Sequence, residues 1–344
     1  MSLPEVSSEA HEILKEVDLI DLHLDGMIPH RLVGYDLNRR HGAGLLGGNF
    51  FGHLDFPRAA DNGLAAGMWS VTTNPLRTAG GRWKALLKNL ESLKGQVDDS
   101  QGAVALARTA SEYRDARGRG AHVVLPAIQG GNALVGAPEG IGSVPDDLLT
   151  RVTLVHLTNS EYGVTSSPLA MGRRAEGLTG LGRELVRDLN SQRVFVDLAH
   201  INPQGFWDAI EVHDPSQPIL ATHTGVDGVL PHWRNLDDDQ LRAVAETGGV
   251  IGIIFHVGFL ARSGGPTDGQ MVLEHMEHVI EVVGEDHVAI GSDYDGAIRP
   301  PHGLRKEPCY PRLVQWMLDR GWSGTRVEKA LGGNFLRCLE QLRP

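Results

Sequence analysis

The stretch GLGRELVRDLNSQRVFVDLAH, residues 180–200, contains the structural unit that decides the fold. Its first half, Gly180 to Leu189, has the apolar spacing of an amphipathic helix. Its second half, Val194 to Ala199, is a mainly apolar run of strand length, and His200 follows directly. Because this run shows no alternation of polar and apolar residues, it indicates a strand buried on both faces, as in a parallel sheet covered by helices.

Similar runs recur along the whole chain. The eight predicted strands are Val17 to Leu22, Ala66 to Thr72, His122 to Ile128, Val152 to Leu157, Val194 to Ala199, Pro218 to Thr222, Val250 to Phe255 and His287 to Gly291. Helical patterns fall between most of them, the clearest being Ala85 to Leu93, Gly180 to Leu189, Asp237 to Glu246 and Gln270 to Val283. Strands that alternate with helices predict an α/β fold, and eight of them predict a single closed (β/α)8 barrel of the TIM type.

The main alternative to a barrel is an open, doubly wound parallel sheet. That fold commonly binds nucleotides at a G-x-G-x-x-G loop after a strand, and none of the predicted strands is followed by such a loop. No change in composition divides the chain. We therefore expect residues 1–344 to form one domain, with long loops at about residues 30–62 and 139–150.

The charge balance narrows the classes of partner. The 344 residues carry 32 Lys and Arg against 43 Asp and Glu, a formal net charge of −11, without a basic tail, which disfavours nucleic acid and anionic membranes as partners. The longest apolar run, Val250 to Leu260, falls short of the roughly 20 residues that span a bilayer. The first residues, MSLPEVSSEA, do not have the pattern of a secretory signal, and two cysteines make no disulfide framework. These features predict a cytoplasmic protein.

Residues that can bind metal follow six of the predicted strands. In strand order they are His23 with Asp25, then Gln129, His156, His200, His223 and Asp293. In a (β/α)8 barrel the carboxyl ends of the strands meet at one rim, where the active site lies. The sequence therefore predicts that these side chains converge.

Imidazole and carboxylate groups together are typical ligands of zinc. His23 and Asp25 are two positions apart on one strand, so they can face the same ion. His200 and His223 come from neighbouring strands and can share a second ion. A single histidine at a strand end is more often a structural, hydrogen-bonded residue, so the prediction of a metal site depends on all these positions together.

Several motifs resemble those of a known family. They are HxD at His23, VDLAH ending at His200, ATHTGV around His223, HWRNLDDDQLRAVAETGGVIGI, DHVAIGSDYDG around Asp293, and LGGNFLR. From about Asp18 to Arg337 the chain is similar to the membrane (renal-type) dipeptidases, a branch of the amidohydrolase superfamily. The resemblance implies a binuclear zinc hydrolase on a (β/α)8 barrel that cleaves dipeptides. In position, His23 and Asp25 match the ligands of the first metal, and His200 and His223 match those of the second.

The resemblance also implies how the substrate is bound and cleaved. His156, in LVHLTN, matches the histidine that contacts the scissile carbonyl group, and Arg234, in HWRNL, matches the arginine that holds the substrate carboxylate. Asp293 matches the acid/base near the bridging water. A metal ion would make hydroxide available near neutral pH, and Asp293 would transfer the proton to the departing amine.

One position departs from the family pattern. The family has a bridging glutamate in a sequence like E-G-G, whereas this chain has Gln129 in AIQGGN. Two dications about 3.5 Å apart repel one another strongly, and glutamine brings no charge to offset that repulsion. Three outcomes are open: two zinc ions with Gln129 as a neutral ligand, one zinc ion, or a protein that only binds a dipeptide-like ligand. We expect one or two zinc ions per chain and retained hydrolysis.

Other assignments remain open at the level of sequence. Hydrolysis of another amide, by deacylation or deamidation, is the enzymatic alternative to cleavage of a small dipeptide, and a homodimer is one option for the oligomeric state. His275 and His278 are three positions apart on a predicted helix, not four as in H-E-x-x-H, so we expect a solvated helix face. His53 and Asp55 are expected to be loop or pocket-wall residues.

Overall fold

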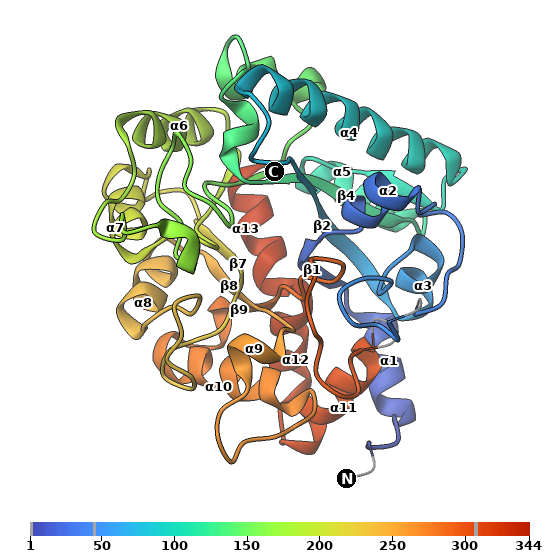
Figure 1. Cartoon of the computed structure of the whole chain (residues 1–344). Helices are drawn as coiled ribbons and strands as arrows, with labels where there is room; N and C mark the ends of the chain where they lie inside the picture. Colours follow the sequence, from blue (N-terminus) through green and yellow to red (C-terminus); the bar gives the residue numbers. More distant parts are fainter. Residues whose placement is uncertain (1–2, 44–45, 306–308) are drawn as a thin grey trace.

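The sheet closes into a barrel of parallel strands (Figure 1). The computed structural model describes residues 3–43, 46–305 and 309–344, and within these ranges eight strands run in the order β2-β1-β9-β8-β7-β6-β5-β4, with β4 paired to β2. The strands are β1 (Leu19–Leu24), β2 (Leu64–Thr72), β4 (His122–Gln129), β5 (Arg151–Thr153), β6 (Phe195–Asp197), β7 (Leu220–Thr224), β8 (Val250–Ile253) and β9 (Val288–Ile290). This arrangement confirms the predicted (β/α)8 barrel.

A further short strand, β3 (Val104–Leu106), pairs in parallel with the start of β4. It was not predicted, because three of the five residues in the run Ala103 to Ala107 are alanine, which is depleted in strands. Each of the eight predicted apolar runs overlaps a barrel strand. Their ends differ by up to four residues, since strand limits are the least predictable part of an element.

Helices surround the barrel (Figure 1). The α-helices are α1 (Ser8–Glu16), α2 (Met27–Val33), α3 (Phe56–Asp61), α4 (Ala79–Asp99), α5 (Ala110–Gly118), α6 (Gly180–Ser191), α7 (Pro203–Val212), α8 (Asp238–Glu246), α9 (Val257–Leu260), α10 (Gln270–Val283), α11 (Tyr310–Asp319), α12 (Gly324–Glu328) and α13 (Asn334–Leu342). Shorter turns are η1 (Gly131–Leu134), η2 (Gly140–Ser143), η3 (Pro145–Asp147), η4 (Pro168–Ala170), η5 (Glu285–His287) and the π-helical η6 (Lys329–Gly333).

The helix ends follow from local chemistry. Asp237 and Gln240 form a reciprocal capping box at the start of α8, which satisfies two backbone groups that the helix leaves without partners. Helix α10 ends at Gly284, whose φ of 91° is accessible to glycine at little cost. These signals explain why both helices begin and end within one residue of their predicted limits.

The two predicted loops contain more regular structure than expected. The range 30–62 includes the end of α2 and all of α3, and the range 139–150 includes η2 and η3. Helix α3 has only six residues, too few to show an apolar stripe, although Asp55 caps it through a hydrogen bond to the amide of Arg58. The prediction of long loops in these two ranges did not include these short helices and turns.

The last helix closes one end of the barrel. Phe335, Leu339 and Leu342 of α13 belong to a buried cluster with apolar side chains from seven barrel strands. Polar contacts join α13 to residues at or before strand starts: the Asn334 side chain donates to the carbonyl of Val288, and Arg337 donates to that of Gly248. The amino-terminal end of the barrel is therefore covered, and the carboxyl-terminal end is left for the polar side chains.

His275 differs from its prediction. It is fully buried: its Nδ1 accepts from the amide of Val226 at 2.9 Å, and its Nε2 lies 3.1 Å from the carbonyl oxygen of Leu260. Only His278 is on the outer side, where it pairs with Asp238. Expecting a solvated face for both was wrong, because His275 supplies hydrogen bonds to buried backbone groups that would otherwise lack partners.

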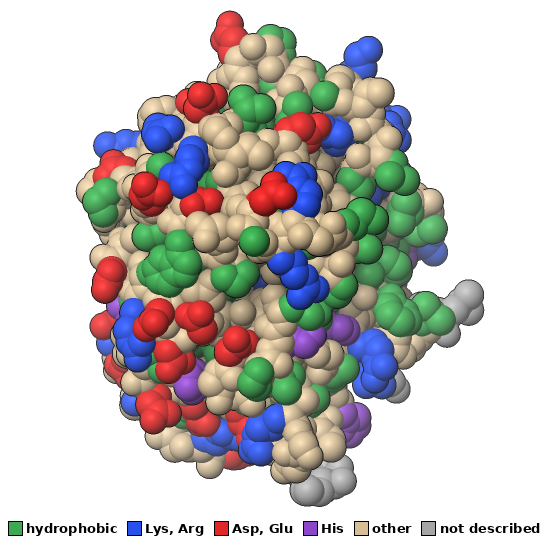
Figure 2. All heavy atoms as spheres, turned by 60° about the vertical axis from the view of Figure 1, so that its left-hand side comes forward, with side chains coloured by type: hydrophobic (Ala, Val, Ile, Leu, Met, Phe, Trp, Pro, Cys, Tyr) green, Lys and Arg blue, Asp and Glu red, His purple; other side chains and the backbone are tan. Residues whose placement is uncertain are grey.

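Acidic side chains gather on the lower left of the surface turned forward in Figure 2, the side on which α7, α8 and α10 lie in Figure 1. This agrees with the net charge of −11. No helix in the described part of the chain is both long and apolar enough to cross a membrane.

Candidate active site

The residues predicted from the strand ends lie together at the carboxyl-terminal end of the barrel. They lie in, or within three residues after, β1, β4, β5, β6, β7 and β9, and they are His23, Asp25, Gln129, His156, His200, His223 and Asp293. All are buried except His156, which is partly exposed. The fold therefore brings residues more than 250 positions apart into one small volume.

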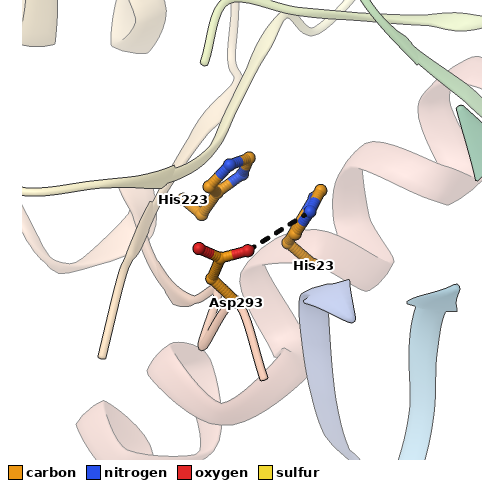
Figure 3. Close-up of side chains that lie close together, drawn as sticks. All are labelled: His23, His223 and Asp293. Carbon is orange, nitrogen blue, oxygen red and sulfur yellow. Dashed lines mark ion pairs between the residues drawn. The ribbon is translucent and has the colours of Figure 1, made fainter. Parts of the chain in front are cut away.

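The tightest group of potential ligands consists of His23, His223 and Asp293 (Figure 3). One ligand atom from each lies within 4.8 Å of the other two. The two imidazole rings are stacked with centroids 3.8 Å apart, and His23 Nε2 lies 3.6 Å from Asp293 Oδ1. Asp293 was predicted as an acid/base, and the geometry makes it a potential metal ligand as well.

Asp25 and His200 adjoin this group on different sides. Asp25 Oδ2 lies 3.5 Å from His23 Nε2, and His200 Nε2 lies 2.8 Å from His223 Nε2. The two residues of each predicted pair, His23 with Asp25 and His200 with His223, therefore lie within contact distance of each other. Which of these atoms bind an ion remains a prediction.

Gln129 lies between the two pairs. In the amide orientation that matches donors with acceptors, its nitrogen lies 3.0 Å from Asp25 Oδ2, and its oxygen lies 3.1 Å from His200 Nε2 and 3.2 Å from His156 Nε2. The glycine that follows, Gly130, has a φ of 100°. This turn directly after β4 directs the chain away while Gln129 remains in the site.

The hydroxyl group of Thr222 orients the ring of His223 through Nδ1, the ring nitrogen that faces away from the cavity. Thr222 Oγ1 donates to Asp197 Oδ2 at 2.8 Å, so it can only accept at its 2.9 Å contact with His223 Nδ1. The proton of neutral His223 is therefore on Nδ1, and the Nε2 lone pair faces the cavity. Such a partner is what a metal-binding histidine requires.

A buried ion pair under the site was missed at the level of sequence. Arg151 and Asp197 are both fully buried and lie 3.3 Å apart. Arg151 donates to Ser70 Oγ at 2.6 Å and lies 3.0 Å from His23 Nδ1. Ser70 Oγ is itself 3.4 Å from that ring nitrogen. The sequence does contain a signal for Arg151 and Asp197, since each of these charged residues lies in or beside an otherwise apolar predicted strand.

Burial sets the protonation of the site. It lowers the pKa of His156 to about 4 and the pKa values of His200 and His223 well below the usual value of 6.5. Burial, and then the charge of Asp25, raises the pKa of Asp293 well above the usual value. The imidazoles of His156, His200 and His223 are therefore neutral near pH 7, which is the form that binds metal.

Two of the site residues have unusual backbone conformations. His200 has a φ of 67° and Asp293 a φ of 62°, in the left-handed region that residues other than glycine rarely adopt. Each lies three residues after the end of its strand, β6 or β9. Strain of this kind persists where the surrounding structure holds a side chain in place, and it is concentrated at functional sites.

Arg234 lies beside the histidines and is almost completely buried. Its guanidinium donates to the carbonyl oxygen of His223 at 2.5 Å, and its Nε has no hydrogen-bond partner among the described residues. Burial lowers its pKa to about 10, so it is still a cation at pH 7. A buried cation with an unused donor is suited to bind an anionic group.

His53 and Asp55 serve the loop and not the metal group, in line with their prediction. Asp295 accepts hydrogen bonds from the amides of Gly52 and His53 at 2.8 and 2.9 Å. The Nδ1 atom of His53 accepts from the amide of Asp295 at 3.0 Å, and Asp55 pairs with Arg58. These contacts fix the loop against the end of β9.

Known proteins match this chain over nearly its whole length. The model of the membrane dipeptidase family, peptidase family M19, matches residues 7–343. The crystal structure of dipeptidase AC, a metallo peptidase of family M19, has a TM-score of 0.81 at 25% identity and covers 95% of this chain and 99% of its own.

Two other solved structures share the fold. The probable dipeptidase PvdM from Pseudomonas aeruginosa has a TM-score of 0.82 at 17% identity, covering 97% of each chain. A metallo peptidase from Rhodobacter sphaeroides, liganded with a phosphinate mimic of L-Ala-D-Ala, has a TM-score of 0.79 at 24% identity, covering 95% of this chain and 99% of its own. An uncharacterized protein in the pqqA 5′ region of Klebsiella pneumoniae is 36% identical over 169 residues, which is 48% of this chain and 61% of that relative, less than two thirds of its length.

Proposed function

The chain belongs to the membrane dipeptidase family, peptidase family M19, and from this premise we propose that it cleaves the peptide bond of small dipeptides with zinc as its metal. Membership of the family makes it a metal-dependent hydrolase of the dipeptidase type. The observation that carries the finer proposal is the buried group of His23, His223 and Asp293 at the carboxyl ends of three barrel strands.

The residues present fit a zinc ion. Two imidazoles and a carboxylate leave a further coordination position for water or substrate, as in catalytic zinc sites. Asp293 Oδ1 is buried and has no hydrogen-bond donor among the described residues. A buried carboxylate oxygen without a donor is costly, and facing a cation would offset that cost.

Each residue of the site has a role that its position supports. When bound, the metal ion would polarise the peptide carbonyl and lower the pKa of a water molecule. Asp293, whose pKa is raised by burial, would accept a proton from the attacking water and pass it to the leaving amine nitrogen. His156 is the partly exposed member of the site and would donate a hydrogen bond to the carbonyl oxygen. Arg234 would hold the substrate carboxylate.

The experiment that tests the function is a substrate panel with and without chelation. We expect turnover of L,L- or L,D-dipeptides by the zinc-loaded protein, loss of turnover after metal removal, and recovery when zinc is restored. N-acyl amino acids and side-chain amides serve as the comparison. Faster turnover of those compounds would indicate a different amidohydrolase reaction, and binding of dipeptides without turnover of any substrate would indicate a binding protein.

Arg234→Lys should selectively weaken recognition of the free carboxylate. A charge-assisted hydrogen bond contributes about 1.5–3 kcal/mol, so we expect kcat/KM for a dipeptide to fall by about 10- to 100-fold. The matched comparison is the same dipeptide with a C-terminal carboxamide. The wild type should disfavour the amide, and the variant should lose most of that preference. An equal fall for both substrates would mean that Arg234 does not bind the carboxylate.

A further inference from the structure

The position of Gln129 determines how many ions the site can hold. Residue 129 lies between Asp25 and His200. A second ion that was bound by His200 and lay next to the first ion would therefore have to contact this residue. An amide nitrogen cannot bind a cation, and the single amide oxygen can face only one side of the site. Gln129 therefore cannot bind two ions at once, whereas a carboxylate can bind one ion through each of its two oxygens.

Hydrogen bonds already use both ends of this amide. Its nitrogen is 3.0 and 3.3 Å from the two carboxylate oxygens of Asp25, and its oxygen is 3.1 Å from His200 Nε2. Since the oxygen can only accept, His200 Nε2 is the donor in this contact. The Nε2 atom of His200 is therefore already engaged by the oxygen of Gln129.

His200 also lacks the support that His223 has. Its Nδ1 atom is buried and has no hydrogen-bond partner among the described residues, whereas His223 Nδ1 is fixed by Thr222. No hydrogen bond within the described part of the chain therefore fixes the His200 ring through Nδ1, whereas one fixes the ring of His223.

The charge of the site leads to the same result. Asp25 and Asp293 are the carboxylates that face His23 Nε2, at 3.5 and 3.6 Å, and their two negative charges balance one dication. A second dication would leave an excess of two positive charges, and the buried cation of Arg234 adds to that excess. Uncompensated charge in a buried site is strongly unfavourable.

We propose that this chain holds one catalytic metal ion, on His23, His223 and Asp293, and that the Gln129 amide occupies by hydrogen bonds the place of a second ion. The proposal depends on the metal dependence of the function above, not on its substrate. It departs from the two-metal site that the family resemblance implies.

The test is the metal content of the whole protein, measured by inductively coupled plasma mass spectrometry after equilibration with zinc and removal of the free metal. We expect one zinc per chain in the wild type and two in Gln129→Glu, because the new carboxylate can face both sides. Gln192→Glu, a change at an exposed position, is the matched control and should retain one. Two ions in the wild type, or none, would overturn the proposal, and so would one in Gln129→Glu.

Cobalt titration of the wild type gives an answer that does not need the variant to fold. Cobalt absorption should saturate at one equivalent, and a rise continuing to two would overturn the proposal. Measuring dipeptide turnover on the same sample tests the number of ions and the proposed function separately. Two ions with dipeptide turnover refute only the single-ion site, and one ion without turnover of any dipeptide refutes only the substrate.

Discussion

Asp293→Asn is expected to lower kcat by about 10²- to 10⁴-fold, the range for loss of a general acid–base group. Asparagine keeps the size of the side chain and removes its ability to carry a proton between the water and the leaving amine. The carboxylate lies 3.6 Å from His23 Nε2, within the group that could hold the metal ion.

The measurement is steady-state turnover of a dipeptide at saturating zinc, with metal content determined on the same samples. Saturating metal separates a loss of proton transfer from a loss of metal affinity, which matters because Asp293 is also a potential ligand. Asp286→Asn, at an exposed carboxylate that pairs with Lys329, is the matched control and should leave kcat unchanged. Full activity of Asp293→Asn with bound zinc would remove Asp293 from the mechanism.

Asp197→Asn is expected to cause the largest loss of stability. The carboxylate pairs with Arg151 and accepts from Thr153 Oγ1 at 2.6 Å and from Thr222 N and Oγ1 at 2.9 and 2.8 Å. The variant leaves the Arg151 cation buried without a counter-charge. Removing one partner of a buried ion pair costs about 3–5 kcal/mol of the free energy of unfolding.

Urea unfolding followed by circular dichroism, on the chelated protein, would measure this effect without a contribution from bound metal. Glu176→Gln is the matched control, because Glu176 pairs with Arg173 at the surface, where solvent screens the pair, and breaking it should change the stability little. We also expect zinc affinity to fall, since Thr222 orients His223 through the same carboxylate. A destabilisation equal to that of the control would show that Arg151 finds another partner.

The fold was largely predictable because its signals are local. Apolar runs of four to eight residues and helices with one apolar face depend only on neighbouring residues, so all eight barrel strands were recognised. Helix α3 (Phe56–Asp61) was missed because it is too short to show an apolar stripe, and strand β3 (Val104–Leu106) because its surroundings are rich in alanine. His275 was misjudged because its burial depends on the backbone of distant segments at Val226 and Leu260.

The candidate site was predictable as a set of residues but not as an arrangement. Family motifs and the rule that barrel strands end at one rim brought out His23, His223 and Asp293, because residue type and position along a strand are properties of the sequence. The location in the cell and the oligomeric state stay predictions. The sequence also showed that Gln129 stands where the family has a glutamate. It did not decide whether the site binds two metal ions, one or none.

Only the tertiary structure decided how these groups face one another. It placed the Gln129 amide between Asp25 and His200 and placed Arg151 behind His23. Hydrogen bonds and charge interactions act over a few ångströms in space, between residues that are far apart along the chain. The sequence therefore determined which chemical groups are present and which strands carry them, and the closure of the barrel decided which of them are near enough to share a proton or an ion.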